Sequence, residues 1–189
     1  MERPKHPSTL TSVDNLGLVL ESQGKYEEAE VMHQRALEAR EKVLGPEHPS
    51  TLTSADNLGS VLKSQSKYEE AEAMHRRALK GTEKVLGPEH PDTLASVNNL
   101  GSVLKSQGKY EEAEAMHRRA LKVREKVLGP EHPSTLTSAD NLGSVLKSQS
   151  KYEEAEAMHR RAPKGYEKVL GPEHPSTLAS VSNLLVRAR

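Results

Sequence analysis

Histidine is the residue type in this chain whose number and spacing first suggest chemistry. The nine histidines form two series with a spacing of 42 residues: His6, His48, His90, His132 and His174, and His33, His75, His117 and His159. A metal site needs several imidazole nitrogens within about 2 Å of one ion. Equivalent residues on packed helices lie about 10 Å apart. We therefore predict no metal ligand. We expect the linker histidines His48, His90 and His132 to bond nearby backbone, and the second series to pack or to form a local hydrogen bond.

Catalytic patterns are missing from the sequence. Serine, histidine and aspartate all occur, but no Gly-x-Ser-x-Gly turn is present to expose a nucleophile. Acidic neighbours such as Glu69 and Glu70 point apart on a helix and cannot form a carboxylate pair. No Gly-x-x-x-x-Gly-Lys phosphate loop occurs. The sequence predicts a protein that is not an enzyme, with no catalytic residue and no cofactor.

The composition argues against nucleic-acid binding and against association with a membrane. Lys plus Arg and Asp plus Glu each number 27, so the formal net charge is zero. A general nucleic-acid or membrane-surface binder would need a basic excess. The chain has no cysteine, and no apolar run is long enough to cross a bilayer. Without an evident signal peptide, a cytoplasmic protein is the expectation.

A 42-residue repeat organises the whole chain. Tyr26, Tyr68, Tyr110 and Tyr152 each lie in the string Lys-Tyr-Glu-Glu-Ala-Glu. A period of this size indicates a stacked array in which function comes from a surface built by several repeats. We predict one array over residues 1–189, with repeats at about 8–49, 50–91, 92–133 and 134–175, and a further first helix at 176–189.

Each repeat contains two helical patterns. In the second repeat, apolar residues at helical spacing predict helix A at 50–64 and helix B at 68–86. Gly87-Pro88 should end helix B, and Pro91 should begin the next helix A. Asp92, and Ser50 and Ser134 in other copies, should supply the oxygen that caps the first amides of helix A.

Two further local features lie on helix B. Acid–base pairs four residues apart should support its exposed face: Glu72 with Arg76, Glu114 with Arg118, and Glu156 with Arg160. Repeats 50–91 and 134–175 differ at only two positions, where Pro163 and Tyr166 replace Leu79 and Thr82. A proline inside a helix removes an amide donor and crowds the preceding turn. We predict a kink or break near 159–165.

The string Asn57-Leu58-Gly59, Leu62, Tyr68, Ala71 and Ala78-Leu79 resembles the tetratricopeptide repeat. The 42-residue period, with Leu86-Gly87-Pro88-Glu89-His90-Pro91 between units, is similar to the kinesin light chain type of that repeat. The resemblance implies an all-α, right-handed superhelical solenoid of antiparallel helix pairs, packed closely at Gly59, Ala71 and Ala78. The near-identical copies are also similar to repeat arrays of fungal and bacterial NLR-like (NACHT or NB-ARC) proteins.

The resemblance further implies a protein or peptide partner bound in a concave groove lined by helix A. The corresponding residues here are Asn15, Thr53, Asp56, Asn57, Ser60, Lys63, Asn98, Asn99, Lys105, Asp140, Asn141 and Lys147. An asparagine amide can clamp the backbone of an extended peptide, or it can bond a neighbouring helix and fix the stacking. Three hypotheses therefore stand: a peptide-binding module, a sensing or self-assembling array of a larger NLR-like protein, and a structural scaffold.

Overall fold

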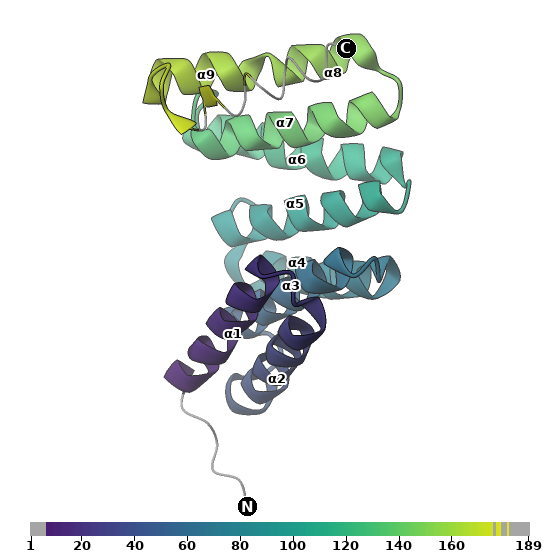
Figure 1. Ribbon diagram of the computed structural model, residues 1–189, viewed down its shortest axis with the longest axis vertical. Helices are drawn as coiled ribbons and strands as arrows, with labels where there is room; N and C mark the ends of the chain where they lie inside the picture. The colour runs from purple at the N-terminus through teal and green to yellow at the C-terminus, as the bar shows by residue number, and fades with distance from the viewer. Residues whose placement is uncertain (1–6, 176, 179–180, 182–189) are drawn as a thin grey trace, which may run out of the picture. The chain divides into compact units, whose positions relative to one another are not determined.

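The computed structural model describes residues 7–175, 177, 178 and 181, and in these residues the regular structure is entirely α-helical (Figure 1). The helices are α1 (Pro7–Ser22), α2 (Tyr26–Leu44), α3 (Pro49–Ser64), α4 (Tyr68–Leu86), α5 (Pro91–Ser106), α6 (Tyr110–Leu128), α7 (Pro133–Ser148), α8 (Tyr152–His159) and α9 (Arg161–Leu170). The predicted helices at 50–64 and 68–86 are confirmed to within one residue. Most of the expected helix at 176–189 lies outside the described residues.

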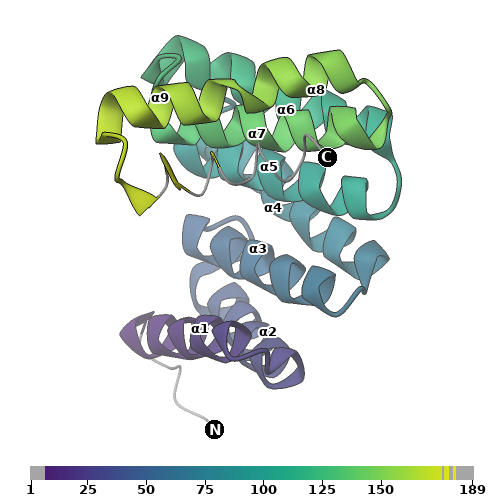
Figure 2. The same cartoon turned by 45° about the horizontal axis from the view of Figure 1, so that its top comes forward.

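The helices group into two compact units, Met1–Gln107 and Gly108–Arg189. In the first unit, α1 packs on α2, α2 on α3, α3 on α4 and α4 on α5, so each helix contacts its neighbours in sequence (Figure 2). In the second unit, α6 packs on α7, and α7 packs on both α8 and α9. Packing between sequence neighbours is the expected arrangement of a repeat array. The prediction of one continuous array over 1–189 stays a prediction.

The linker histidines cap the helices that follow them. The Nδ1 atom of His48 accepts a hydrogen bond from the backbone amide of Ser50, with an N···N distance of 3.1 Å. His90 and His132 do the same for the amides of Asp92 and Ser134. The predicted backbone bonding by these histidines is confirmed.

The predicted capping by Ser50, Asp92 and Ser134 is wrong. Helix A begins one residue earlier than expected, at the proline, so residue 50 already lies inside the first turn. There its amide is a donor without a helical acceptor, and the histidine before the proline supplies that acceptor.

A glycine follows the last residue of α2, α4, α6 and α9 in a conformation that other residues rarely adopt. Gly87 has φ 90° and ψ 163°, a region that is essentially restricted to glycine. Its carbonyl accepts a hydrogen bond from the Thr93 hydroxyl at 2.8 Å, which ties the linker to the next helix A. Gly45, Gly129 and Gly171 have the same φ within a few degrees.

Small residues bring the two helices of a repeat close together. A Cβ atom at Gly59 would lie 2.7 Å from Cε1 of the His75 ring, closer than real Cβ contacts. Ala71 and Ala78 on α4 have no exposed surface. The close packing predicted at these three positions is confirmed, and His75 fills the space that Gly59 leaves.

The fourth helix B is broken where the sequence places proline. Helix α8 ends at His159 and α9 begins at Arg161, whereas α4 and α6 run through the equivalent residues without interruption. Pro163 lies in the first turn of α9. Backbone amides in a first turn have no acceptor within their own helix, so proline costs α9 no hydrogen bond there. The predicted break is confirmed.

Replacing Pro163 with leucine should join α8 and α9, because leucine restores the residue that repeat 50–91 carries at Leu79. We expect the second unit to be stabilised by about 1–3 kcal/mol, less than or equal to the cost of proline in a regular helix. Circular dichroism should show more helix and a higher unfolding temperature. Leu79→Pro is the matched control and should break α4; an unchanged P163L spectrum would contradict this account.

Gly59→Ala should destabilise the first unit. Alanine normally favours a helix over glycine by about 1 kcal/mol. Here the added methyl group meets the His75 ring, and such overpacking costs about 1–3 kcal/mol. Urea unfolding measures the difference, with Ser60→Ala as the neighbouring control. A G59A protein that is more stable than wild type would show that the close approach is not a constraint.

Candidate functional site

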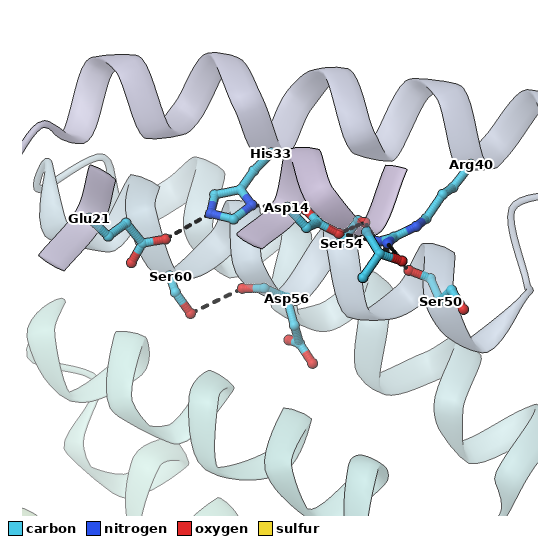
Figure 3. Close-up of polar contacts among 9 residues, drawn as sticks. Asp14, Glu21, His33, Arg40, Ser50, Ser54, Asp56 and Ser60 are labelled. Atoms are coloured by element: carbon cyan, nitrogen blue, oxygen red, sulfur yellow. Dashed lines mark hydrogen bonds and ion pairs between the residues drawn. The ribbon is translucent and has the colours of Figure 1, made fainter. Parts of the chain in front are cut away.

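A buried polar network joins the first three helices (Figure 3). The Asp14 carboxylate on α1 contacts His33 and Arg40 of α2, with 3.0 Å between His33 Nδ1 and Asp14 Oδ1. The Ser54 hydroxyl of α3 donates to the same carboxylate at 2.8 Å. On its other side, His33 Nε2 lies 3.0 Å from Oε1 of Glu21. One carboxylate therefore links a helix pair to the pair that follows.

The network favours the charged form of Asp14. Burial by itself would raise the pKa of this carboxyl group. The hydrogen bonds from His33 and Ser54 and the positive charge of Arg40 outweigh burial, so the pKa lies below its ordinary value of 3.8. The ionised carboxylate is thus a stabilising part of the fold.

The same contact recurs in other repeats. The Asp56 carboxylate lies 2.8 Å from His75 Nδ1 and accepts a hydrogen bond from the Ser96 hydroxyl. Asp140 Oδ1 lies 2.5 Å from His159 Nδ1. The local hydrogen bond predicted for the second histidine series is confirmed at these positions. Asp56 and Asp140, both candidate groove residues, therefore use carboxylate oxygens to hold helix B.

The helix A face is defined here as the side of α1, α3 and α5 that carries Asn15, Asn57 and Asn99. Helix α3 contacts both α1 and α5, so these residues lie on neighbouring helices of the first unit. Asn15 and Thr53 are exposed, while Asn57 and Asn99 are partly buried. Asn98 and Lys105 on α5 are also partly buried.

A pocket of about 210 Å³ opens between α3 and α5 on this face. The Lys63 amino group donates a hydrogen bond to Ser102 across it, and burial lowers the pKa of Lys63. The structure thus brings together three candidate residues, Ser60, Lys63 and Asn99, and adds three that the sequence reasoning missed: Ser64, His75 and Ser102. Ser102 was detectable, since it lies 42 residues after Ser60.

Not every candidate polar group on this face is available to a ligand. The hydroxyl groups of Thr53 and Ser60 donate to carbonyls four residues earlier in their own helix, at 3.1 and 3.0 Å. By contrast, the side-chain amides of Asn57 and Asn99 form no hydrogen bond with another described residue. In the first repeat Glu21 occupies the place of Lys63, and its carboxylate bonds His33 instead.

The second unit carries the remaining candidates on α7. Asp140 and Asn141 are partly buried, and Lys147 is exposed. The Asn141 amide likewise forms no hydrogen bond within the described part of the chain. Each unit therefore presents at least one asparagine of the 42-residue series.

The outer face of helix B is covered by ion pairs. Arg76 pairs with Glu72 at 2.7 Å, Arg118 with Glu114 at 2.7 Å, and Arg160 with Glu156, as the four-residue spacing predicted. Among the described residues, no three or more His, Cys, Asp or Glu side chains form a group suited to a metal ion. No described helix is long and apolar enough to cross a membrane.

Consecutive antiparallel helix pairs, packed through small residues and joined by glycine-proline linkers, define an all-α solenoid of helical repeats. The chain belongs to the tetratricopeptide repeat family, which matches residues 7–84, 57–126 and 92–168. Folds of this family commonly mediate protein–protein interactions and are typically not enzymes.

Solved structures with the same fold include kinesin light chain-like proteins. The chain is 29% identical to a putative kinesin light chain of Podosopora anserina with nearly identical TPR-like repeats. The match has a TM-score of 0.81 and covers 95% of this chain and 85% of that one. A variant of the same protein gives a TM-score of 0.82 at the same identity and coverage. BtubC (BKLC) from P. vanneervenii is 26% identical, with a TM-score of 0.78 over 92% of this chain and 69% of that one.

A comparison with curated protein sequences finds no match. The predicted resemblance to the tetratricopeptide repeat of the kinesin light chain type is thus confirmed by the family match and the solved structures. The resemblance to arrays of NLR-like proteins stays a prediction.

Asp14→Asn should weaken the first unit in a pH-dependent way. The pKa of Asp14 is lower in the folded state, so its stabilising effect is present above its ordinary pKa of 3.8 and is lost as pH falls through the folded value. At neutral pH we expect D14N to cost about 1–3 kcal/mol, because Arg40 loses its charged partner. The difference from wild type should shrink as the pH falls below 3.8 and through the lower pKa of the folded state.

Urea unfolding at several pH values measures this difference. Asp92→Asn, at an exposed carboxylate on α5, is the matched control and should change stability little. A D14N deficit that is constant from neutral to acid pH would contradict the role assigned to the ionised carboxylate.

Proposed function

We propose that this chain is a protein-interaction module that binds an extended peptide segment along the helix A face. The observation that carries the proposal is the pair of asparagine amides on neighbouring helices, Asn57 on α3 and Asn99 on α5, which form no hydrogen bond within the described structure. An asparagine that served only to fix the stacking would bond the adjacent helix.

Each amide offers two donors and an acceptor to a ligand. A peptide backbone in an extended conformation presents unpaired amide and carbonyl groups at regular intervals. The asparagine series can pair with these groups without regard to the side chains of the peptide. Backbone contacts of this kind supply affinity.

Selectivity would come from the pocket beside the asparagines. Lys63 provides a positive charge that is held in place by its bond to Ser102. Burial already disfavours the charged form of this lysine, so an anionic group placed next to it would gain a strong charge-assisted hydrogen bond. We therefore propose that the preferred peptide carries an acidic side chain or a terminal carboxylate at this position.

The combined variant Asn57→Ala, Asn99→Ala and Asn141→Ala tests this function. Peptides selected from a displayed random library against the wild-type chain serve as probes. Each lost amide would leave peptide groups unpaired at about 1 kcal/mol, so we expect the triple variant to bind at least about tenfold more weakly. Fluorescence anisotropy measures the affinity.

The matched control is Lys80→Ala, Lys122→Ala and Lys164→Ala, at exposed positions of helix B with the same 42-residue spacing. It should bind like wild type. Selected peptides that keep full affinity for the asparagine triple variant would overturn the proposal.

A second candidate function is a sensing or self-assembling array within a larger NLR-like protein. The observation that favours it is the near identity of repeats 50–91 and 134–175, which differ at two positions. A nucleotide-binding domain encoded upstream in the same gene would support this function. A gene with no such domain would remove its main support and leave the peptide-binding module or a structural scaffold.

A further inference from the structure

A second pocket, of about 390 Å³, lies between α2 and α4 in the first unit. Apolar side chains of Leu37, Leu58, Leu62 and Met74 contribute to its wall. Its polar lining is mainly acidic. The complete lining is Glu30, Gln34, Leu37, Glu38, Glu41, Leu58, Leu62, Glu70, Ala73, Met74 and Arg77.

The acidic groups are only partly neutralised by the protein. Arg77 pairs with Glu41 at 2.5 Å, and Lys67 pairs with Glu30 at 2.8 Å. Glu38 accepts a hydrogen bond from the neutral amide of Gln34 at 2.7 Å. Glu70 is exposed and interacts with the Lys67 charge, whose direct ion pair is with Glu30. The pocket therefore keeps a negative charge beside an apolar wall.

The second unit contains the equivalent surface between α6 and α8, which provides an internal comparison. Nine of the eleven lining positions carry the same residue 84 positions later. The two differences are Arg118 in place of Gln34 and Lys122 in place of Glu38. With these two residues, the equivalent lining in the second unit holds three positive and three negative side chains. Of the two surfaces, the one between α2 and α4 therefore carries the acidic excess.

Arg118 shows which chemical group fits this surface. Its guanidinium bonds Glu114 on its own helix at 2.7 Å and reaches Glu154 on α8 at 2.9 Å. These glutamates are the equivalents of Glu30 and Glu70. The bonds from Lys151 and then from Arg118 lower the pKa of Glu114 to about 2. In the first unit Gln34 is neutral, and no arginine of the described residues bridges the two glutamates.

We propose that the pocket between α2 and α4 binds an arginine side chain from a basic, partly apolar segment of a protein partner. The guanidinium would take the place that Arg118 occupies in the second unit and bridge Glu30 and Glu70. The aliphatic part of the arginine and an adjacent apolar side chain would contact the leucine and methionine wall. A planar guanidinium suits two carboxylates better than the compact ammonium of lysine.

This site is separate from the helix A face. Its lining comes from α2, α3 and α4 and shares no residue with the pocket between α3 and α5. The two surfaces also differ in charge, since Lys63 makes one basic and the glutamates make the other acidic. The arginine site therefore does not depend on the function proposed above.

Fluorescence anisotropy with a labelled peptide tests the site. The probe is Leu-Arg-Leu in a glycine-serine background, and its control contains citrulline, which keeps the shape but lacks the charge. We expect one peptide to bind per chain, with the citrulline peptide at least about tenfold weaker because charge-assisted hydrogen bonds are lost. Affinity should fall with added salt.

Two double variants exchange the residues that differ between the first and third repeats. Gln34→Arg with Glu38→Lys gives the first unit the residues of the third repeat and should weaken binding at least about tenfold. Arg118→Gln with Lys122→Glu should create a second site, so that two peptides bind per chain. All four positions are exposed, and each pair of residues already exists in a folded repeat, so the fold should be kept.

The triple asparagine variant should bind this probe like wild type, which separates this site from the helix A face. Equal binding of the citrulline peptide, or full affinity in the Gln34→Arg, Glu38→Lys variant, would overturn the proposal. So would an Arg118→Gln, Lys122→Glu variant that still binds a single peptide. Self-association of the wild-type chain that ends in the Gln34→Arg, Glu38→Lys variant, without peptide binding, would assign the pocket to a second copy instead.

Discussion

The contact between a glycine of helix A and a histidine ring of helix B is the constraint on which the packing of the first, second and fourth repeats depends. At Gly17, Gly59 and Gly143 an added Cβ would lie 2.6–2.9 Å from the ring of the following helix. The missing side chain lets the helices approach, and the ring fills the gap with a group that is both flat and polar. This chain has no phenylalanine or tryptophan, and histidine supplies the flat ring at this contact.

The same histidine connects packing to electrostatics. Its Nδ1 atom lies against an aspartate on helix A, and the other oxygen of that aspartate bonds a serine of the next helix A, as with Asp14 and Ser54. A buried carboxylate is tolerated here because every partner is a donor. The histidines and aspartates that first suggested chemistry are therefore occupied by the fold. The ligand contacts proposed above therefore use other side chains: the asparagines and Lys63 on the helix A face, and the glutamates of the pocket between α2 and α4.

Near-identical repeats do not give identical surfaces. The apolar residues are the same at the α2–α4 and α6–α8 surfaces, but the charges differ. Gln34 and Glu38 make the first surface acidic, whereas Arg118 and Lys122 balance the negative charges of the second. Pro163 similarly divides one helix B in a repeat that differs from residues 50–91 at only one other position, Tyr166. A few substitutions on a repeated scaffold are therefore enough to give two equivalent surfaces different charges.

The sequence by itself determined the features that depend on local spacing: the bounds of the helices to within one residue, the break at Pro163, and the Glu72–Arg76 pair. These follow from helical periodicity and from interactions within one or two turns. The cap of helix A was predicted only in part. The backbone hydrogen bond of His48 was expected, but the start of the helix at Pro49 was not.

The tertiary structure decided which distant side chains meet. The bond from His75 to Asp56 joins residues 19 apart, and the bond from Lys63 to Ser102 joins residues 39 apart. Periodicity places such residues on a helix but not opposite a partner, because the pairing depends on how closely two helices approach and on their rotation about their axes. For the same reason only the folded chain shows that Asp56 is used internally while the Asn57 amide beside it forms no hydrogen bond with another described residue.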